Sequence, residues 1–243
     1  MEPEPLHFER LTAYFARIWV LPVKPSRFLP PMPDHPTLDP ARIRQLDRDQ
    51  GQRLAASNQG EVWRHQLDGL DLAIKTPSGR GLAWRLRQAT LLREHQAYQR
   101  LAGLSGFAPC YGLVDQRFLV LGHVSGTPFR QADIDDREQF FDQLLERIQA
   151  MHSRGIAHGD LKRKDNLLVS DQGEPIILDL GAATLLRTGF HPVNQRLFRF
   201  MRQTDLNAWI KLKYDGYRNI SDQDSNLLRR SWLERTLGRL RRR

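Results

Sequence analysis

Three polar residues in the second half of the chain have the types and spacing of a metal site. Asp160 and Asn166 share one loop region, and Asp179 follows after two apolar runs, residues 167–169 and 176–178. An Asp-Gln-Gly turn signal separates these runs, so we expect a β-hairpin that brings the three polar side chains to the same end. Clustered oxygen ligands suit Mg²⁺, a hard cation that proteins bind through a few carboxylates together with substrate phosphates.

The segment that starts with His-Gly-Asp-Leu-Lys at residue 158 resembles the catalytic loop and metal-binding motif of the protein-kinase-like superfamily. The resemblance implies that Asp160 accepts the proton of an attacking hydroxyl, while Asn166 and Asp179 hold Mg²⁺ on the phosphates of ATP. Lys162 resembles the loop lysine that neutralises the γ-phosphate. The alternative is three unrelated polar residues in surface turns, and the order of all three elements argues against it.

The same resemblance implies a strand lysine on the α- and β-phosphates, paired with a helix glutamate. Lys75 ends an apolar run after Asp68-Gly69, a hairpin signal, and Glu94 lies in a predicted helix over residues 82–101. A lone lysine or glutamate is ordinarily a solvated side chain. Their coincidence with the downstream motif favours an ion pair.

Further nucleotide contacts follow from the resemblance. Gly60 stands where the glycine-rich phosphate loop should end, and the family's earlier glycines are replaced here by Ala55 and Ser57. Small side chains still let backbone N–H groups approach phosphates closely. The residues implied to hold adenine are Val62 and Ala73 against the ring, and Gly122 and Val124 through their backbone at the hinge.

The elements that must position these residues give an α+β class, because strands come first and helices dominate later. The strongest helix prediction is residues 137–153, where apolar residues fall on one face. The resemblance implies a two-lobed protein-kinase-like fold with a shortened, mainly helical C-lobe. We expect three parts: an N-terminal amphipathic helix with a proline-rich connector, residues 1–40; an N-lobe, residues 41–121; and a C-lobe with the catalytic loop and a basic tail, residues 122–243.

Four features depart from the kinase pattern. Asn166 lies one residue further from Asp160 than usual, so either the loop bulges or Asp165 takes the metal; we favour Asn166. Gly159 replaces the arginine that grips a phosphorylated loop in many regulated kinases. No Ala-Pro-Glu follows Asp179, and 62 residues remain after Gly181. The helix at 137–153 follows the hinge almost directly.

This abbreviated C-lobe resembles the lipopolysaccharide core-sugar (Kdo and heptose) kinases and the RIO-type kinases. Asp205, which lies shortly before Trp209, resembles the buried aspartate that braces the catalytic loop in these folds. The resemblance covers roughly residues 54–210.

Composition and charge set the context. The chain has 243 residues, a net charge of +9 and one cysteine, Cys110. The lone cysteine excludes an internal disulfide and fits a reducing compartment, and no secretory signal is evident, so we expect a cytoplasmic protein. The positive charge favours an anionic partner.

Residues 228–243 combine seven arginines with apolar residues at helical spacing. With a predicted helix over residues 6–21, they suggest peripheral contact with the inner face of an anionic membrane.

We therefore expect an ATP- and Mg²⁺-dependent kinase that acts on a hydroxyl acceptor, with a lipopolysaccharide core sugar as the main interpretation. A compact Ser/Thr protein kinase is the closest alternative, and a nucleotide-binding pseudokinase is the second. The retained lysine, glutamate, asparagine and aspartates argue against a pseudokinase. Nucleic-acid binding rests on net charge alone, since the sequence shows no zinc spacing or RNA-binding aromatic motif.

Overall fold

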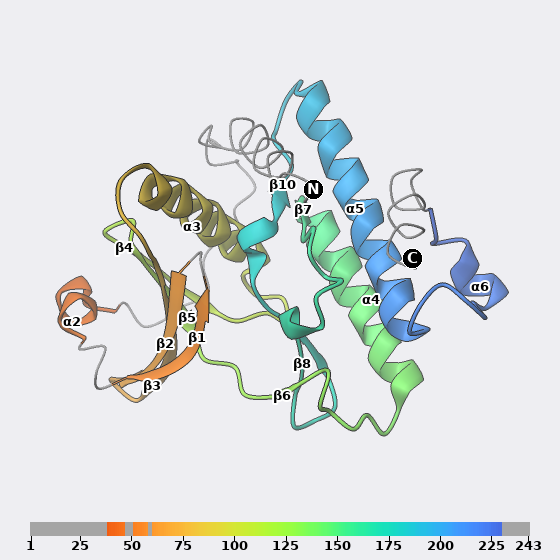
Figure 1. The fold of residues 1–243 in the computed structure, drawn as a ribbon, viewed down its shortest axis with the longest axis horizontal. Helices are drawn as coiled ribbons and strands as arrows, with labels where there is room; N and C mark the ends of the chain where they lie inside the picture. The colour runs from red at the N-terminus through yellow and green to blue at the C-terminus, as the bar shows by residue number, and fades with distance from the viewer. Residues whose placement is uncertain (1–37, 47–50, 58–59, 230–243) are drawn as a thin grey trace, which may run out of the picture. The chain divides into compact units, whose positions relative to one another are not determined.

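The computed structural model describes residues 38–46, 51–57 and 60–229. The predicted helix over residues 6–21, nearly all of the proline-rich connector and nearly all of the basic tail lie outside the described residues. Contacts divide the chain into two units: residues 1–95 with 110–122, and residues 96–109 with 123–243. The described helices and strands are labelled in Figure 1. No described helix is long and apolar enough to cross a membrane.

The first unit is built on a five-stranded antiparallel sheet in the order β1-β2-β3-β5-β4. Its strands are β1 (Gln52–Ser57), β2 (Gly60–Leu67), β3 (Leu70–Pro77), β4 (Cys110–Val114) and β5 (Phe118–Gly122). The predicted hairpin turn at Asp68-Gly69 joins β2 to β3. Both residues have positive φ, +53° and +76°, as a tight two-residue hairpin turn requires.

The two faces of this sheet carry different residues because side chains alternate along a strand. Leu72, Ile74 and Val120 share one face and form a buried cluster with Ile43 of α2 (Pro40–Gln45). Helix α2 is held there by Arg44, whose guanidinium contacts both carboxylate oxygens of Asp115 at 2.7 and 2.8 Å. The opposite face is therefore the one that can receive the predicted nucleotide-binding residues.

Helix α3 (Gly81–Leu101) matches the helix predicted over residues 82–101. Its last turn belongs to the second unit together with the loop that follows, residues 102–109. In that loop the carbonyl of Gly106 accepts a hydrogen bond from the amide of Ile177 at 2.8 Å. Arg100 donates to the carbonyls of Gly155 and Leu186 at 3.2 and 3.1 Å.

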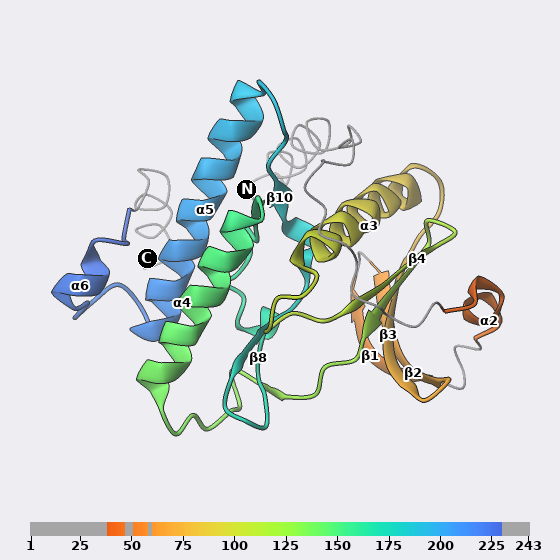
Figure 2. The same cartoon turned by 180° about the vertical axis from the view of Figure 1, so that it is seen from behind.

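The second unit is mainly helical, so the α+β class predicted from the sequence is confirmed. Helices α4 (Arg137–Ser153) and α5 (Pro192–Lys213) pack side by side (Figures 1 and 2), and α6 (Asp222–Ser225) follows them. Its short strands are β6 (Thr127–Pro128), β7 (Ile156–Ala157), β8 (Leu167–Val169), β9 (Pro175–Ile177) and β10 (Thr184–Leu185). The predicted hairpin is present as the antiparallel pair β8 and β9.

Helix α4 spans the residues predicted for it, and local chemistry explains both ends. The carboxylate of Asp136 accepts from the amide of Gln139, which caps the first turn. Gly155 follows the last turn with φ of +72°, a conformation that glycine adopts without strain. On the buried face, the carbonyl of Phe141 accepts from the indole N–H of Trp209 at 2.7 Å, which joins α4 to α5.

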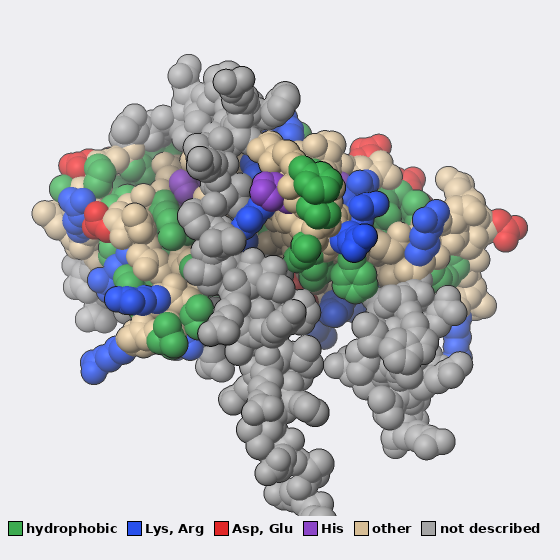
Figure 3. Space-filling model, turned by 90° about the horizontal axis from the view of Figure 1, so that it is seen from above, with side chains coloured by type: hydrophobic (Ala, Val, Ile, Leu, Met, Phe, Trp, Pro, Cys, Tyr) green, Lys and Arg blue, Asp and Glu red, His purple; other side chains and the backbone are tan. Residues whose placement is uncertain are grey.

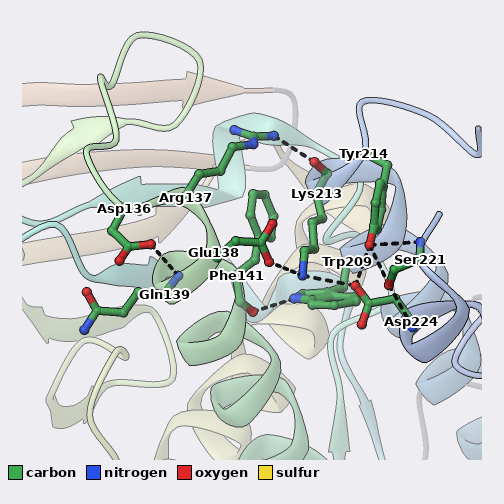
Figure 4. A network of polar contacts seen from close by, with 10 residues as sticks. All are labelled: Asp136, Arg137, Glu138, Gln139, Phe141, Trp209, Lys213, Tyr214, Ser221 and Asp224. Atoms are coloured by element: carbon green, nitrogen blue, oxygen red, sulfur yellow. Dashed lines mark hydrogen bonds and ion pairs between the residues drawn. The ribbon is translucent and has the colours of Figure 1, made fainter. Parts of the chain in front are cut away.

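A polar network ties the start of α4 to the end of α5 and to α6 (Figure 4). The Lys213 ammonium lies 2.7 Å from Glu138 and 3.0 Å from Asp224. Burial lowers the pKa of Lys213, but the hydrogen bonds to Glu138 and Asp224 outweigh it and raise the pKa overall. The Tyr214 hydroxyl also donates to Asp224 at 2.7 Å. Arg137 donates to the carbonyls of the last turn of α5, where a cation is favourable.

Candidate active site

The loop after β7 holds Asp160 and is fixed by a buried carboxylate from α5. Asp205 is fully buried and accepts hydrogen bonds from the backbone amides of His158 and Gly159, both at 2.8 Å. His152 of α4 donates to the same carboxylate at 3.0 Å. Charge-assisted hydrogen bonds of this kind are short and strong. The bracing contact expected for Asp205 is therefore present, and it anchors the loop to the helical core.

The His158 ring connects this loop to the segment that carries Asp179. Its Nδ1 lies 3.3 Å from the backbone amide of Asp160, and its Nε2 lies 2.9 Å from the carbonyl oxygen of Leu178. Because the amide donates, Nδ1 must accept, and the proton must sit on Nε2 to donate to the carbonyl. The His158 ring thus links the backbone of Asp160 to that of Leu178, the residue before Asp179.

Asp160 is partly buried among charges of both signs. Burial is the main cause that raises the pKa of this carboxyl, and Asp179 adds to the rise, whereas Arg163, His158 and Lys162 oppose it. The Arg163 guanidinium lies 3.9 Å from the carboxylate, and the Lys162 side chain is exposed. A carboxylate with a raised pKa accepts a proton more readily, which suits a general base.

The structure separates Asn166 from its neighbour Asp165. Asn166 is 6% exposed, and its amide donates to the carbonyl oxygen of Asp160 at 3.1 Å. Asp165 is exposed and pairs with Arg130 at 2.9 Å. The two residues belong to the 3₁₀ turn η2 (Lys164–Asn166). Asn166 therefore contacts the backbone of Asp160, whereas Asp165 pairs with Arg130 at the surface.

Asp179 adopts a left-handed conformation, with φ of +56°. Aspartate tolerates this region better than most residues because its short side chain can bond locally. Here its carboxylate accepts from the amide of Gly181 at 3.2 Å and caps the 3₁₀ turn η3 (Leu180–Ala182). The carbonyl of Asn166 accepts from the amide of Leu178 at 2.9 Å, which joins the two candidate metal-binding segments.

The donor set in this region fits a magnesium ion that is shared with phosphates. Asn166 supplies a carboxamide oxygen and Asp179 a carboxylate, both hard oxygen donors. Among the described residues, no group of three or more His, Cys, Asp or Glu side chains is placed to hold a metal ion. A magnesium site that uses one carboxylate and one amide needs further oxygens from its substrate and from water.

In the first unit, Lys75 and Glu94 form an ion pair. The ammonium lies 3.0 and 2.8 Å from the two carboxylate oxygens, and the side chains are 16% and 2% exposed. A cleft of about 170 Å³ opens beside them between β3 and α3. Its lining consists of Lys75, Thr76, Pro77, Leu86, Arg87, Thr90, Leu91 and Glu94. The cleft is smaller than the ~300–1,000 Å³ of sites for drug-sized ligands, so it suits a group smaller than a whole nucleotide.

Arg87 is the charged lining residue that was not predicted from the sequence. It precedes Glu94 by two helical turns, so the two face the same side of α3. Its guanidinium donates to the carbonyl oxygen of Ser78 at 2.7 Å, which links the helix to the end of β3. The signal in the sequence was the seven-residue spacing between Arg87 and Glu94, since Glu94 was already predicted to pair with Lys75. The packing of α3 on β3 shows that Arg87 lines the same cleft.

The other residues predicted to contact the nucleotide lie on β2, β3 and β5 or shortly after β5. A Cβ atom at Gly60 would lie 2.2 Å from the carbonyl oxygen of Thr76, so β2 can start there only with glycine. Val62 pairs with Lys75 across the strands, which places Val62, Ala73 and Lys75 on one face of the sheet. Gly122 ends β5 in the first unit, and Val124 belongs to the second. The β1–β2 turn at residues 58–59 lies outside the described residues.

Comparison with known proteins gives partial matches to Ser/Thr protein kinases. The chain is 41% identical over 64 residues to cyclin-dependent kinase F-1 of Oryza sativa subsp. japonica, covering 24% of this chain and 13% of that protein. It is 42% identical over 52 residues to the serine/threonine-protein kinase grp of Drosophila melanogaster, covering 21% and 10%. It is 45% identical over 53 residues to the serine/threonine-protein kinase chk1 of Schizosaccharomyces pombe, covering 22% and 10%.

These matches support a relationship to the protein-kinase-like superfamily and to no narrower family. The chain spans only 10 to 13% of the length of these three relatives. No family model matches the chain. The matched relatives are protein kinases, so the similarity gives no support to a sugar acceptor.

Proposed function

We propose that this chain is an ATP-dependent kinase that transfers the γ-phosphate to a hydroxyl group. The observation that carries the proposal is the arrangement around Asp160, where Asp205 and His158 fix the loop and Asn166 bonds to its backbone. Such bracing holds a reactive carboxylate in one position, which is what positioning and general-base catalysis require. The partial similarity to Ser/Thr protein kinases supports the same activity.

Each candidate residue then has a chemical role. Asp160 accepts the proton of the acceptor hydroxyl while the hydroxyl oxygen forms a bond to the γ-phosphorus of ATP. The bond between that phosphorus and the β-γ bridging oxygen breaks, and ADP is released. Lys162 neutralises charge on the γ-phosphate. Asn166 and Asp179 would hold Mg²⁺, which, when bound, neutralises charge on the phosphates.

In the first unit, Lys75 contacts the α- and β-phosphates and is oriented by Glu94. The hydrogen bonds from Lys75 to both Glu94 oxygens hold the ammonium in one place before any ligand binds. Val62 and Ala73 contact the adenine ring, and backbone groups of Gly122 and Val124 bond its edge. Gly60 allows the backbone at the start of β2 to approach the phosphates.

Two acceptor classes follow from different observations. The comparisons favour a Ser/Thr hydroxyl of a protein, because the relatives are protein kinases. A lipopolysaccharide core sugar is the second candidate acceptor. The observation that favours it is the short segment between β10 and α5. Only residues 186–191 separate those elements, which leaves little chain there for peptide docking.

Labelled ATP and Mg²⁺, incubated with the purified chain and separate pools of soluble protein and cell-envelope glycolipid, would test the proposal. Label in one pool identifies the acceptor class, and Asp160→Asn should abolish it. Asp171→Asn, an exposed aspartate in the β8–β9 turn, is the matched control and should retain transfer. Label in neither pool, with nucleotide still bound, would instead support the pseudokinase interpretation.

A further inference from the structure

Large apolar side chains are exposed where α5 begins. Phe190 is 87% exposed and Val193 is 66% exposed, and Phe200, two turns further along the helix, is 45% exposed. Figure 3 looks onto this end of the molecule and shows hydrophobic and basic side chains next to one another there. Exposed clusters of large apolar side chains with a polar rim commonly mark interaction surfaces.

The charge around these side chains has one sign. Between Asp179 and Asp205 the chain has no acidic residue and four arginines: Arg187, Arg196, Arg199 and Arg202. Val193, Arg196 and Phe200 follow the spacing i, i+3, i+7, so they share one side of the helix. We call Phe190, Val193, Arg196 and Arg199, all exposed, the basic apolar tip.

We propose that the basic apolar tip binds the surface of an anionic membrane. An apolar side chain that projects at 87% exposure can enter the boundary between headgroups and acyl chains. Arginines beside it can remain with the phosphates, because the guanidinium stays in the polar layer while its stem covers apolar surface. Charge complementarity thus favours an anionic bilayer.

The tip is continuous with the candidate catalytic loop in the second unit. Helix α5 carries both Val193 and Asp205, and Asp205 binds the backbone of the loop. Met201 of the same helix lies 3.6 Å from where a Cβ atom would stand on Gly159. Membrane binding at the tip would therefore orient this loop toward acceptors at the membrane, a consequence that rests on the proposed kinase function. The membrane binding itself does not depend on the proposed kinase function.

Co-sedimentation of the full chain with vesicles, without nucleotide, would test the surface. Binding should require phosphatidylglycerol and be absent with phosphatidylcholine alone. Phe190→Ser with Val193→Ser should weaken binding about tenfold, since two apolar side chains no longer leave water. Leu82→Ser, at a residue 74% exposed in the first unit, is the matched control and should bind as the parent does.

The charge contribution needs its own pair of variants. Arg196→Ser with Arg199→Ser should reduce binding about thirtyfold at low salt, because each arginine near an anionic leaflet contributes separately. Arg85→Ser with Arg218→Ser removes two exposed arginines elsewhere and should have a much smaller effect. Equal losses in the two pairs would show that only net charge matters, and would overturn the assignment to this tip.

A site-specific probe separates the tip from the basic tail, which could also attract vesicles. Burial raises the pKa of Cys110 to about 11, so a thiol introduced at Phe190→Cys should react selectively with a polarity-sensitive dye. Phosphatidylglycerol vesicles should shift the dye emission to the blue, and the same dye at Leu82→Cys should not shift. Vesicle binding without a shift at position 190, or an equal shift with soluble polyglutamate, would overturn the proposal.

Discussion

The ammonium group of Lys75 on β3 contacts both carboxylate oxygens of Glu94 on α3, beside the cleft that these two elements line. Glu94 is almost fully buried, so this carboxylate depends on its cationic neighbours. Arg93, whose pKa burial lowers to about 10, is a further charge that interacts with it. We therefore expect the ion pair to contribute to the stability of the first unit and to the proposed binding of phosphates by Lys75.

Replacing one partner of this pair should be costly. Lys75→Met leaves the Glu94 carboxylate buried with less compensation, and we expect the free energy of unfolding to fall by about 3 kcal/mol. The double variant Lys75→Met, Glu94→Gln should recover much of that loss, yet still bind nucleotide weakly. Urea unfolding and nucleotide titration on all four members of the cycle measure the coupling. Strictly additive losses would mean that the two side chains act independently.

The two catalytic-loop carboxylates should fail in different ways. Asp160→Asn should slow transfer by about 10²–10⁴-fold, the usual contribution of a general base, with nucleotide affinity nearly unchanged. Asp179→Asn should instead weaken Mg²⁺-dependent nucleotide binding. Turnover together with a nucleotide titration distinguishes the two effects, with Asp171→Asn as control. Parent-like values for both variants would remove these residues from the site.

The different surroundings of Asn166 and Asp165 predict which of the two binds the metal. Asn166→Ala should raise the Mg²⁺ concentration needed for half-maximal activity far more than Asp165→Ala does. The reason is that Asn166 is buried against the Asp160 backbone, whereas Asp165 is exposed and pairs with Arg130. Magnesium titrations of both variants give the ranking, and the reverse order would transfer the role to Asp165.

The Asp160 carboxyl should leave a signature in the pH dependence of stability. Its pKa in the folded chain is raised, mainly by burial, above the ordinary value of about 3.9. A raised pKa means that its stabilising contribution is complete below the unfolded value and is lost as pH rises through the folded one. The stability of Asp160→Asn relative to the parent should therefore increase as the pH rises from about 3 through the raised pKa of the folded chain, as measured by urea unfolding. Asp171→Asn should show no comparable increase.

Removing the brace should loosen the catalytic loop. Asp205→Ala leaves the backbone amides of His158 and Gly159 without their acceptor, and each buried unpaired group costs about 1–3 kcal/mol. Asp205→Asn keeps an acceptor oxygen and should lose less. Hydrogen exchange should show faster exchange at residues 158 and 159 in the alanine variant. Unchanged protection there would mean that the loop is held by other contacts.

The local signals in the sequence determined much of the secondary structure. Asp68-Gly69 specified a hairpin because two positive φ angles favour those residue types. Helix α4 followed from apolar residues on one face of residues 137–153. The order of Asp160, Asn166 and Asp179 around a hairpin indicated the candidate site, because a hairpin returns the chain to its starting end.

Tertiary structure decided the features that depend on distant parts of the chain. The different surroundings of Asn166 and Asp165 depend on the 3₁₀ turn that directs the Asn166 side chain inward and the Asp165 side chain toward Arg130. Arg87 joined the Lys75 cleft only when α3 packed on β3. The exposure of Phe190 was equally hidden, because an apolar residue in a sequence reads the same whether it enters a core or projects into water. Such outcomes depend on which surfaces meet, and periodicity along a single segment does not contain that information.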